Sequence, residues 1–218
     1  MTDCYQTIKI IDFKQRGITS QVSFSNGYTI RVGRRTLERL GLAEGAEFAP
    51  EEFEKLREIL EWEWAYYTAE SMLARRAYSV GGFRQRLRLK GIAVEHINRI
   101  VTEFREKGFL NDYKYALARG QSLVNQKPVG KAYVIAWLQK RSVPHAVAQQ
   151  AVEELFSGVD EVETAVLLLT RKRAGWAKFD LETTREKAYT YLLRRAISYD
   201  AARQAFDKVF GSATDKTR

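Results

Sequence analysis

The sequence predicts a mostly α protein that begins with a small strand-containing module and continues through a long linking helix. Three observations support this prediction. Runs rich in Ile, Val, Phe, Tyr and Thr are confined to the N-terminal part, and from Pro50 onward apolar residues recur at helical spacing. The chain has only three prolines, and none interrupts a helical pattern. A pattern with a period of about fifty residues then occurs three times, which predicts an elongated, curved tandem array of three three-helix units.

Three short strands are expected in the N-terminal module, residues 1–49. Ser25, Asn26 and Gly27 separate the second strand from the third. Because both positions of Asn-Gly tolerate positive φ, this pair favours a hairpin with a two-residue type I′ turn. The three strand-like runs are Thr7 to Phe13, Gln21 to Ser25 and Tyr28 to Val32.

Helical patterning starts before the repeats. A short helix is expected over Arg34 to Leu40 and should stop at Gly41. A long helix begins at Pro50, which suits a first helical position, and the glutamates after it suit the positive end of the helix dipole. Its apolar residues continue at steps of three and four, so we expect it to reach about Arg76. Its first part, residues 50–68, connects the module to the array.

The repeat is most evident in three hexapeptides, each made of Leu, two variable residues, a cation, a small residue and a β-branched residue. They are Leu87 to Ile92, Leu138 to Val143 and Leu192 to Ile197. Gly91 at the small position predicts a helix end in the left-handed conformation, whereas Ser142 and Ala196 are expected to end their helices in another way. The repeats are assigned to residues 69–111, 112–159 and 160–211, followed by a flexible tail over 212–218.

Apolar residues flank each hexapeptide at constant distances. One precedes its Leu by four positions, and three follow its β-branched residue by five, eight and twelve positions, which places them on one helix face. The preceding residues are Phe83, Val134 and Ala188; the following sets are Ile97, Ile100 and Phe104; Ala148, Ala151 and Leu155; and Ala202, Ala205 and Val209. These positions predict the core of each repeat.

The charge of the chain is strongly basic and is segregated. There are 36 Lys and Arg residues against 27 Asp and Glu residues, for a formal net charge of +9 at pH 7. A surplus of this size favours a polyanionic partner, such as nucleic acid or an acidic protein surface. Residues 71–94 and 113–152 contain several cations and no acid, so the first two helices of repeats 1 and 2 are basic. An unneutralised row of cations is more typical of a binding surface than of a solvated face.

Some cations have an alternative, structural interpretation. Lys90, Arg141 and Arg195 fall at helix C-termini, where a cation interacts favourably with the dipole by about 0.3 to 1 kcal/mol. Trp176 follows a cationic run and stacking of a base on it is conceivable. Docking of Trp176 and Phe179 on the helices of their own repeat is the favoured interpretation.

Signatures of catalysis are weak. Gly130-Lys131 resembles the end of a phosphate-binding loop, but Asn125 and Ala132 replace the first glycine and the hydroxyl residue. The histidines, His96 and His145, have no acidic or thiol partner at metal-ligand spacing, so no metal site is expected.

The single cysteine, Cys4, excludes a disulfide framework and suits a reducing compartment. No run approaches the roughly 20 apolar residues of a membrane span, and the N-terminus lacks the pattern of an export signal. We therefore expect a cytoplasmic protein without a membrane partner.

A short block joins the first and second repeats: Gly108-Phe109-Leu110-Asn111-Asp112, followed by Tyr115-Ala116. It contains a helix C-cap glycine, two anchoring apolar residues and an Asn-Asp pair from which Asp112 caps the next helix. This block resembles the motif that joins the first two units of the RecX regulatory proteins.

Two further patterns are similar to the first and last units of that family: Ala69, Leu73, Arg76 and Ser79; and Tyr191-Leu-Leu-Arg-Arg with Ser198-Tyr199-Asp200. The resemblance covers about residues 69–210, and the strand-rich front resembles the extension of the longer family members. The chain departs from the family at Gly82, where an acid is usual, and at Ser142 and Ala196, which replace a glycine.

The resemblance implies a non-enzymatic modulator of the RecA recombinase that needs no cofactor. It would bind in the groove of the RecA–DNA filament, block filament extension or promote disassembly, and lower ATPase, strand-exchange and coprotease activities. The implied partner is the RecA filament, with weak, non-specific contact to single- or double-stranded DNA, and we expect a monomer. We assign the basic surface to Arg84, Arg86, Arg88, Lys131, Lys140, Arg141, Arg171, Lys172, Arg173, Arg194 and Arg195.

Two alternatives come from other functional classes. In a direct DNA-binding protein, one repeat would act like a helix-turn-helix and read a sequence. The cations are spread over all three repeats, which favours backbone or filament contact over base readout. An enzyme acting on nucleic acid would need a metal-ligand cluster or a phosphate loop, and the sequence has neither pattern.

Overall fold

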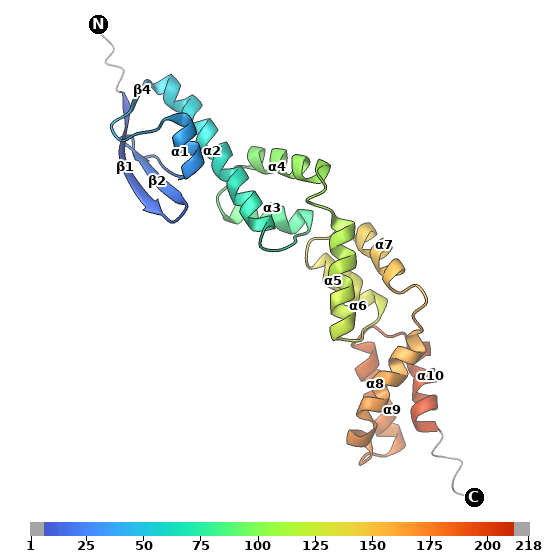
Figure 1. The fold of residues 1–218 in the computed structure, drawn as a ribbon. Coiled ribbons are helices and arrows are strands. Elements are labelled where there is room, and N and C mark those ends of the chain that lie inside the picture. Colours follow the sequence, from blue (N-terminus) through green and yellow to red (C-terminus); the bar gives the residue numbers. More distant parts are fainter. Residues whose placement is uncertain (1–6, 212–218) are drawn as a thin grey trace, which may run out of the picture. The chain divides into compact units, whose positions relative to one another are not determined.

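The structure is a computed structural model that describes residues 7–211 (Figure 1). Cys4 and the predicted tail, 212–218, lie outside the described residues. The chain divides into two compact units. The N-terminal body comprises Met1–Tyr78 and Phe83–Leu110, and the C-terminal body comprises Ser79–Gly82 and Asn111–Arg218.

The N-terminal body begins with a four-stranded antiparallel sheet of order β3-β2-β1-β4. Its strands are β1 (Ile8–Arg16), β2 (Thr19–Phe24), β3 (Thr29–Gly33) and β4 (Glu47–Phe48). The three predicted strands are confirmed, although β1 continues beyond Phe13. The two-residue β4 was not predicted, because a strand this short leaves no alternation to detect.

The hairpin between β2 and β3 is confirmed, but the predicted type I′ turn is wrong. Gly27 has a φ of 85°, whereas Asn26 does not have a positive φ. The Gly27 amide donates to the Phe24 carbonyl at 3.0 Å, and the Phe24 amide donates to the Tyr28 carbonyl at 2.9 Å. These bonds close a three-residue loop with glycine in the left-handed region, the second common hairpin geometry. In it, Asn26 Oδ1 accepts from the Tyr28 amide at 3.0 Å.

One face of the sheet packs against a long helix. Alternate residues of β2 and β3 point to this face, so Val22, Phe24 and Val32 are buried. Phe24 meets Phe53 edge-on, with 5.1 Å between the ring centroids. The helices of this body are α1 (Arg34–Leu40), α2 (Pro50–Leu73), α3 (Val80–Leu89) and α4 (Val94–Glu106). The first three residues of α3 cluster with the C-terminal body.

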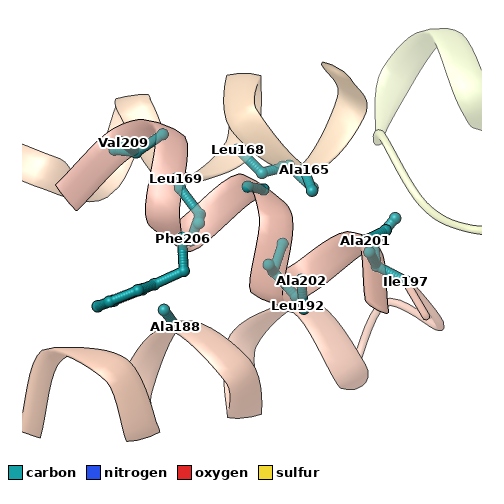
Figure 2. Packing of buried hydrophobic residues seen from close by; sticks show 11 residues of the cluster. Ala165, Leu168, Leu169, Ala188, Leu192, Ile197, Ala201, Ala202, Phe206 and Val209 are labelled. Carbon is teal, nitrogen blue, oxygen red and sulfur yellow. The ribbon is translucent and has the colours of Figure 1, made fainter. Parts of the chain in front are cut away.

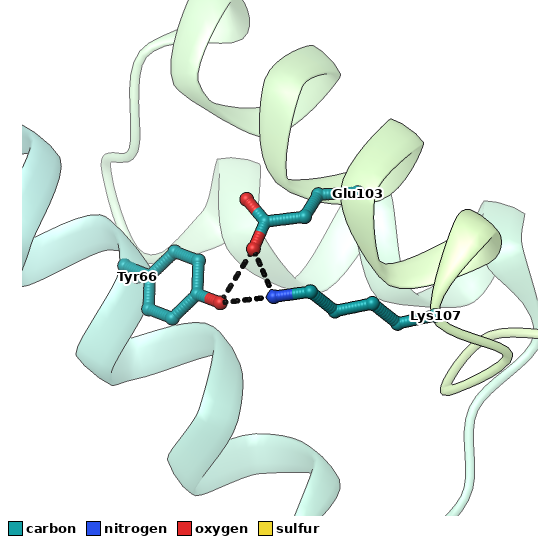
Figure 3. Close-up of polar contacts among 3 residues, drawn as sticks. All are labelled: Tyr66, Glu103 and Lys107. Atoms are coloured by element: carbon teal, nitrogen blue, oxygen red, sulfur yellow. Dashed lines mark hydrogen bonds and ion pairs between the residues drawn. The ribbon is translucent and has the colours of Figure 1, made fainter.

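Helix α2 ends three residues earlier than predicted. Ala74 is the C-cap, and the chain leaves the helix before Arg75 and Arg76. The apolar spacing stops at Met72 and Leu73, so no buried contact holds another turn. A polar contact also joins α2 to α4: Tyr66 Oη donates to Glu103 at 2.7 Å, and Lys107 Nζ donates to the same oxygen at 2.6 Å (Figure 3).

The C-terminal body contains two groups of three helices, each with its own core. In the first group, α6 and α7 bury Val134, Leu138, Ala148 and Ala151. In the second group, α8, α9 and α10 converge on Ala188, Leu192, Ala202 and Phe206, among others (Figure 2). The helices are α5 (Asp112–Gln126), α6 (Lys131–Gln139), α7 (His145–Leu155), α8 (Glu161–Trp176), α9 (Leu181–Leu193) and α10 (Tyr199–Phe210).

The flanking apolar positions of the three hexapeptides are buried as predicted, apart from Leu155, which is only partly buried. The mostly α fold with a small strand-containing module is confirmed. The described residues contain ten helices, and none of these helices is long and apolar enough to cross a membrane.

Each hexapeptide forms a Schellman motif, which explains its repetition. The amide of the β-branched residue donates to the carbonyl of the leucine five positions earlier: Ile92 to Leu87, Val143 to Leu138 and Ile197 to Leu192. Both side chains of each pair are buried, which is the hydrophobic contact that accompanies this motif. The conserved pattern of leucine, small residue and β-branched residue in the three copies is therefore a helix end.

The expectation that Ser142 and Ala196 end their helices in another way is wrong. Gly91, Ser142 and Ala196 have φ values of 77°, 61° and 55°, so all three adopt the left-handed conformation. A residue with a Cβ pays an energetic cost of roughly 1 to 2 kcal/mol there. Burial of the leucine and the β-branched residue outweighs this cost.

The block between the first two repeats also differs in part. Gly108 is left-handed as predicted, and Leu110 is buried, but Phe109 is 61% exposed. Asn111, and not Asp112, caps α5, because its side chain accepts from the Lys114 amide at 2.9 Å. Asp112 instead accepts from the amide of Val80, the first residue of α3, at 2.8 Å.

Candidate basic interface

The eleven predicted basic residues are divided between the two bodies. Arg84, Arg86 and Arg88 lie on α3 in the N-terminal body, and the other eight lie in the C-terminal body. Each group is therefore a candidate surface of its own body.

On α3, the three arginines differ in their surroundings. Arg84 is partly buried and donates to Asn98 Oδ1 of α4. Arg86 and Arg88 are exposed in the last turn of the helix, where their positive charges interact favourably with the negative end of the helix dipole. In the described part of the chain, no carboxylate forms an ion pair with any of the three.

In the C-terminal body, several cations act on the phenol side chain of Tyr133. Lys127 Nζ donates to Tyr133 Oη at 3.1 Å and lies 4.7 Å from the centroid of the same ring. This hydrogen bond and the charge of Lys127 lower the pKa of Tyr133, and the charges of Lys140 and Arg195 lower it further. Lys127, Lys140 and Arg195 come from different segments of the chain, and all three act on this one tyrosine.

A second aromatic ring lies under the neighbouring cations. The Arg195 guanidinium is 3.8 Å from the ring centroid of Tyr191, and Lys172 Nζ is 5.5 Å from it. Arg195 also donates to the Tyr191 carbonyl at 3.1 Å, which occupies a free carbonyl at the end of α9. Trp176 meets Tyr191 edge-on at 5.8 Å, as the docking interpretation predicted.

A backbone contact brings these two rings into one cluster. The Gly130 amide, at the start of α6, donates to the Arg195 carbonyl at 2.8 Å. A Cβ at Gly130 would lie only 1.9 Å from the Ala196 carbonyl oxygen, so this approach requires glycine. We call the resulting surface the basic-aromatic cluster; it consists of Lys127, Tyr133, Lys140, Lys172, Tyr191 and Arg195.

The other predicted cations of this body lie outside the basic-aromatic cluster. Arg141 stacks on Trp137, 3.4 Å from its ring centroid, and donates to the Trp137 carbonyl at 3.1 Å. It thereby repeats the arrangement of Arg195 and Tyr191. Four further cations are exposed, and in the part of the chain that the structure describes no contact joins them to the cluster: Lys131, Arg171, Arg173 and Arg194. Arg141 and Arg195 therefore both have the structural role at a helix end that was the alternative interpretation.

Lys127 and the two tyrosines were missed by the sequence reasoning. Lys127 and Tyr133 are six positions apart across a turn, which is not a helical spacing. The only signal was the acid-free window that contains both residues. Tyr191 lies four residues before Arg195, a spacing that does predict contact on a helix.

The chemistry of the cluster suits binding of a polyanion. Its four cations have no carboxylate partner in the described residues, and two of them, Lys127 and Arg195, are held on aromatic faces. Holding a long side chain in place reduces the entropy that is lost on binding. Within residues 7–211, no group of His, Cys, Asp and Glu side chains is placed to hold a metal ion.

The chain is 30% identical to a regulatory protein RecX of Trichlorobacter lovleyi over 148 residues, which cover 66% of this chain and 94% of that protein. It is 28% identical to the RecX of Syntrophotalea carbinolica over 149 residues, 95% of that protein. The match to the RecX of Finegoldia magna, at 27% identity, spans 120 residues and only 58% of that protein. No family model matches the chain.

Two solved structures share the fold. The crystal structure of RecX from Lactobacillus salivarius has a TM-score of 0.62 at 19% identity, covering 68% of this chain and 96% of that chain. A second crystal structure of a regulatory protein RecX has a TM-score of 0.64 at 14% identity, covering 92% of this chain and 99% of that chain. The second match extends over most of the N-terminal module as well as the helices.

Proposed function

The chain belongs to the family of RecX regulatory proteins, and from this membership we propose that it is a negative regulator of the RecA recombinase. In this proposal it binds in the groove of the RecA–DNA filament. There it blocks filament extension or promotes disassembly, and it thereby inhibits the ATPase, strand-exchange and coprotease activities. The protein acts by binding and not by catalysis.

The observation that carries the proposal is the basic-aromatic cluster in the C-terminal body. Among the described residues, no carboxylate forms an ion pair with its cations, and its backbone is fixed by the contact between Gly130 and Arg195. A protein–DNA filament offers phosphates and acidic side chains, and both are bound by Lys and Arg. We propose that the exposed cations Lys131, Arg171, Arg173 and Arg194, together with Arg141, extend this surface.

Binding of this kind depends on salt. Release of counterions from single-stranded DNA gives a slope of roughly −0.7 in log K against log salt for each phosphate that is neutralised. Removing cations from the surface should therefore weaken binding and also flatten its salt dependence.

The test is the affinity for preformed RecA filaments on single-stranded DNA. We expect the triple variant Lys127→Ala, Lys140→Ala and Lys172→Ala to bind at least tenfold more weakly, with a shallower salt slope. The matched control replaces three other exposed lysines by alanine: Lys55, Lys114 and Lys208. It changes the net charge by the same amount as the triple variant in the cluster. If both variants lose affinity to the same extent, net charge and not the basic-aromatic cluster drives binding, and the assignment of the interface is wrong.

Direct, sequence-specific DNA binding is the competing function. The same proteins are titrated onto DNA duplexes without RecA. Binding to one duplex sequence at concentrations well below those needed for the filament would support the competing function.

A further inference from the structure

The N-terminal body contains a groove of which the predicted filament-binding surface includes only Arg86. Its volume is about 400 Å³, and its walls come from β3, α2 and α3. Four cations line it, one from the strand, one from just beyond the end of α2, and two from α3 and the turn after it: Arg31, Arg75, Arg86 and Lys90. None of the described residues that line this groove is acidic.

Aromatic rings form much of the same wall. Trp64 and Tyr67, on α2, have ring centroids 5.8 Å apart and planes inclined by 29°, so they stand nearly parallel. Tyr78 lines the groove beyond the end of the helix. All three rings are partly exposed. The Arg31 guanidinium lies 5.9 Å from the centroid of Trp64, which places a cation beside a ring face at the entrance from the sheet.

The groove continues into a second cavity of about 570 Å³. The two cavities share Arg31, Trp64 and Lys90 as lining residues, so together they form one elongated depression between the sheet and the end of α3. Glu61 is the one carboxylate among the described residues of the second cavity. It accepts from Tyr28 Oη at 3.0 Å and lies 3.8 Å from Arg57, so its charge is already engaged.

The cations of the groove are available for a ligand. In the described part of the chain, none of the four forms an ion pair. All four side chains are exposed. Four uncompensated charges around one depression repel each other, and an anion bound between them relieves that repulsion.

We propose that this groove binds a single-stranded segment of nucleic acid, with phosphates on the four cations and bases against the rings of Trp64, Tyr67 and Tyr78. Cations that follow a backbone together with rings on which bases stack are the two parts of a single-strand site. An acidic peptide would pair with the cations, but its carboxylates would not stack on the aromatic rings. A duplex keeps its bases stacked on each other and offers the rings no base face.

This inference does not rest on the proposed regulation of RecA, and it gives the N-terminal module a role. Arg31 belongs to the strand-containing module, whereas the other three cations follow α2 or lie on and after α3. The sheet and the helices therefore supply one site jointly. Site assembly depends on the packing of Val32, Phe53 and Leu60, which fixes β3 against α2.

The experiment measures binding of the full chain to a fluorescent oligothymidylate by anisotropy, without RecA. We expect the double variant Arg75→Ala and Lys90→Ala to bind about tenfold more weakly, because both side chains are exposed and act only through their charge. Its salt slope should be shallower by about 0.7 for each phosphate contact that is lost. The matched control, Lys55→Ala and Lys114→Ala, should bind like the unmodified chain.

A ring variant tests stacking separately. Tyr67→Leu keeps an apolar side chain but removes the aromatic ring, and it should weaken binding by about tenfold while leaving the salt slope unchanged. Circular dichroism confirms that each variant is folded. The proposal is overturned if the groove variants bind as tightly as the control, or if a duplex or polyglutamate competes as well as the single strand. Because RecA is absent, failure here leaves the proposed regulatory function untouched.

Discussion

The amide of Gly130 donates to the carbonyl of Arg195 at 2.8 Å, so the start of α6 lies directly against the end of α9. A comparable approach occurs at Gly81, where a Cβ would lie 2.7 Å from both Cβ and the carbonyl oxygen of Ser142. In both cases a glycine meets the left-handed residue in the hexapeptide of the next repeat. The helix end therefore serves two purposes. It terminates its own helix, and its backbone packs against a glycine of the preceding repeat.

Gly130→Ala should destabilise the protein. The added methyl group would meet a backbone oxygen, which cannot move without disturbing the Schellman motif at Ala196. Overpacking of this kind costs about 1 to 3 kcal/mol. Chemical denaturation measures the change, with Gly175→Ala as the control. A Cβ at Gly175, within α8, meets nothing within 4 Å, so this control should gain about 0.5 to 1 kcal/mol from helix propensity. Equal stability of the two variants would contradict the contact.

Ala196→Gly should stabilise the protein. Ala196 has a φ of 55°, and glycine removes the cost of placing a Cβ in the left-handed region. After subtraction of the larger chain entropy of unfolded glycine, a gain of about 0.5 to 1 kcal/mol remains. Ser142→Gly should behave in the same way. The free energy of unfolding measures both, and a loss of stability would show that neither side chain is strained.

The contact between Tyr66, Glu103 and Lys107 predicts a dependence of stability on pH (Figure 3). The hydrogen bonds from Lys107 and then Tyr66 lower the pKa of Glu103, and the bond to Glu103 raises the pKa of Lys107. The stabilisation is thus present above the unfolded pKa of glutamate and is lost as the pH falls through the lowered pKa. It is also lost in strong base, as the pH rises through the raised pKa of Lys107.

Glu103→Gln should therefore be less stable than the unmodified chain at neutral pH, and the difference should vanish in acid. Thermal denaturation across this pH range measures the difference. Glu106→Gln, at an exposed position of the same helix, is the matched control. A stability difference that persists in acid would mean that packing, and not the ionised carboxylate, is responsible.

Thr68→Val should raise stability. Thr68 is 6% exposed, and its hydroxyl oxygen has no hydrogen-bond partner among the described residues. An unsatisfied buried polar group costs about 1 to 3 kcal/mol, and valine has nearly the same shape. An increase of about 1 kcal/mol in the free energy of unfolding is expected. A decrease would reveal that the hydroxyl has a partner in solution.

Replacement of Arg84, Arg86 and Arg88 by alanine should leave helicity intact and weaken inhibition of the RecA filament. Arg86 and Arg88 are exposed, and the core contacts of α3 come from Phe83 and Leu87. Circular dichroism and the RecA ATPase rate measure the two effects. Unchanged inhibition would remove this face of α3 from the interface.

Much of the fold follows from local patterns in the sequence. The hexapeptides contain a leucine and a β-branched residue at the spacing of a Schellman motif, so they predict where α3, α6 and α9 end. The left-handed conformation of Ser142 and Ala196 was not predictable from their own side chains, because burial of their neighbours imposes it. The turn at Asn26 and Gly27 similarly depends on the register of β2 and β3 and not on the dipeptide alone.

The candidate sites were less predictable than the fold. Charge patterning identified Lys140, Lys172 and Arg195, but the contact of Lys127 with Tyr133 crosses a turn. The groove beside Trp64 combines a strand residue with helix residues from distant segments. No spacing in the sequence reports such an arrangement, because it arises only when the sheet packs on α2.

The most direct test of the central claim is the ATPase rate of RecA on single-stranded DNA as the full chain is added, with binding to the same DNA alone measured in parallel. The account predicts strong inhibition at concentrations too low to bind bare DNA. An unaffected ATPase rate beside tight, sequence-dependent DNA binding would contradict it.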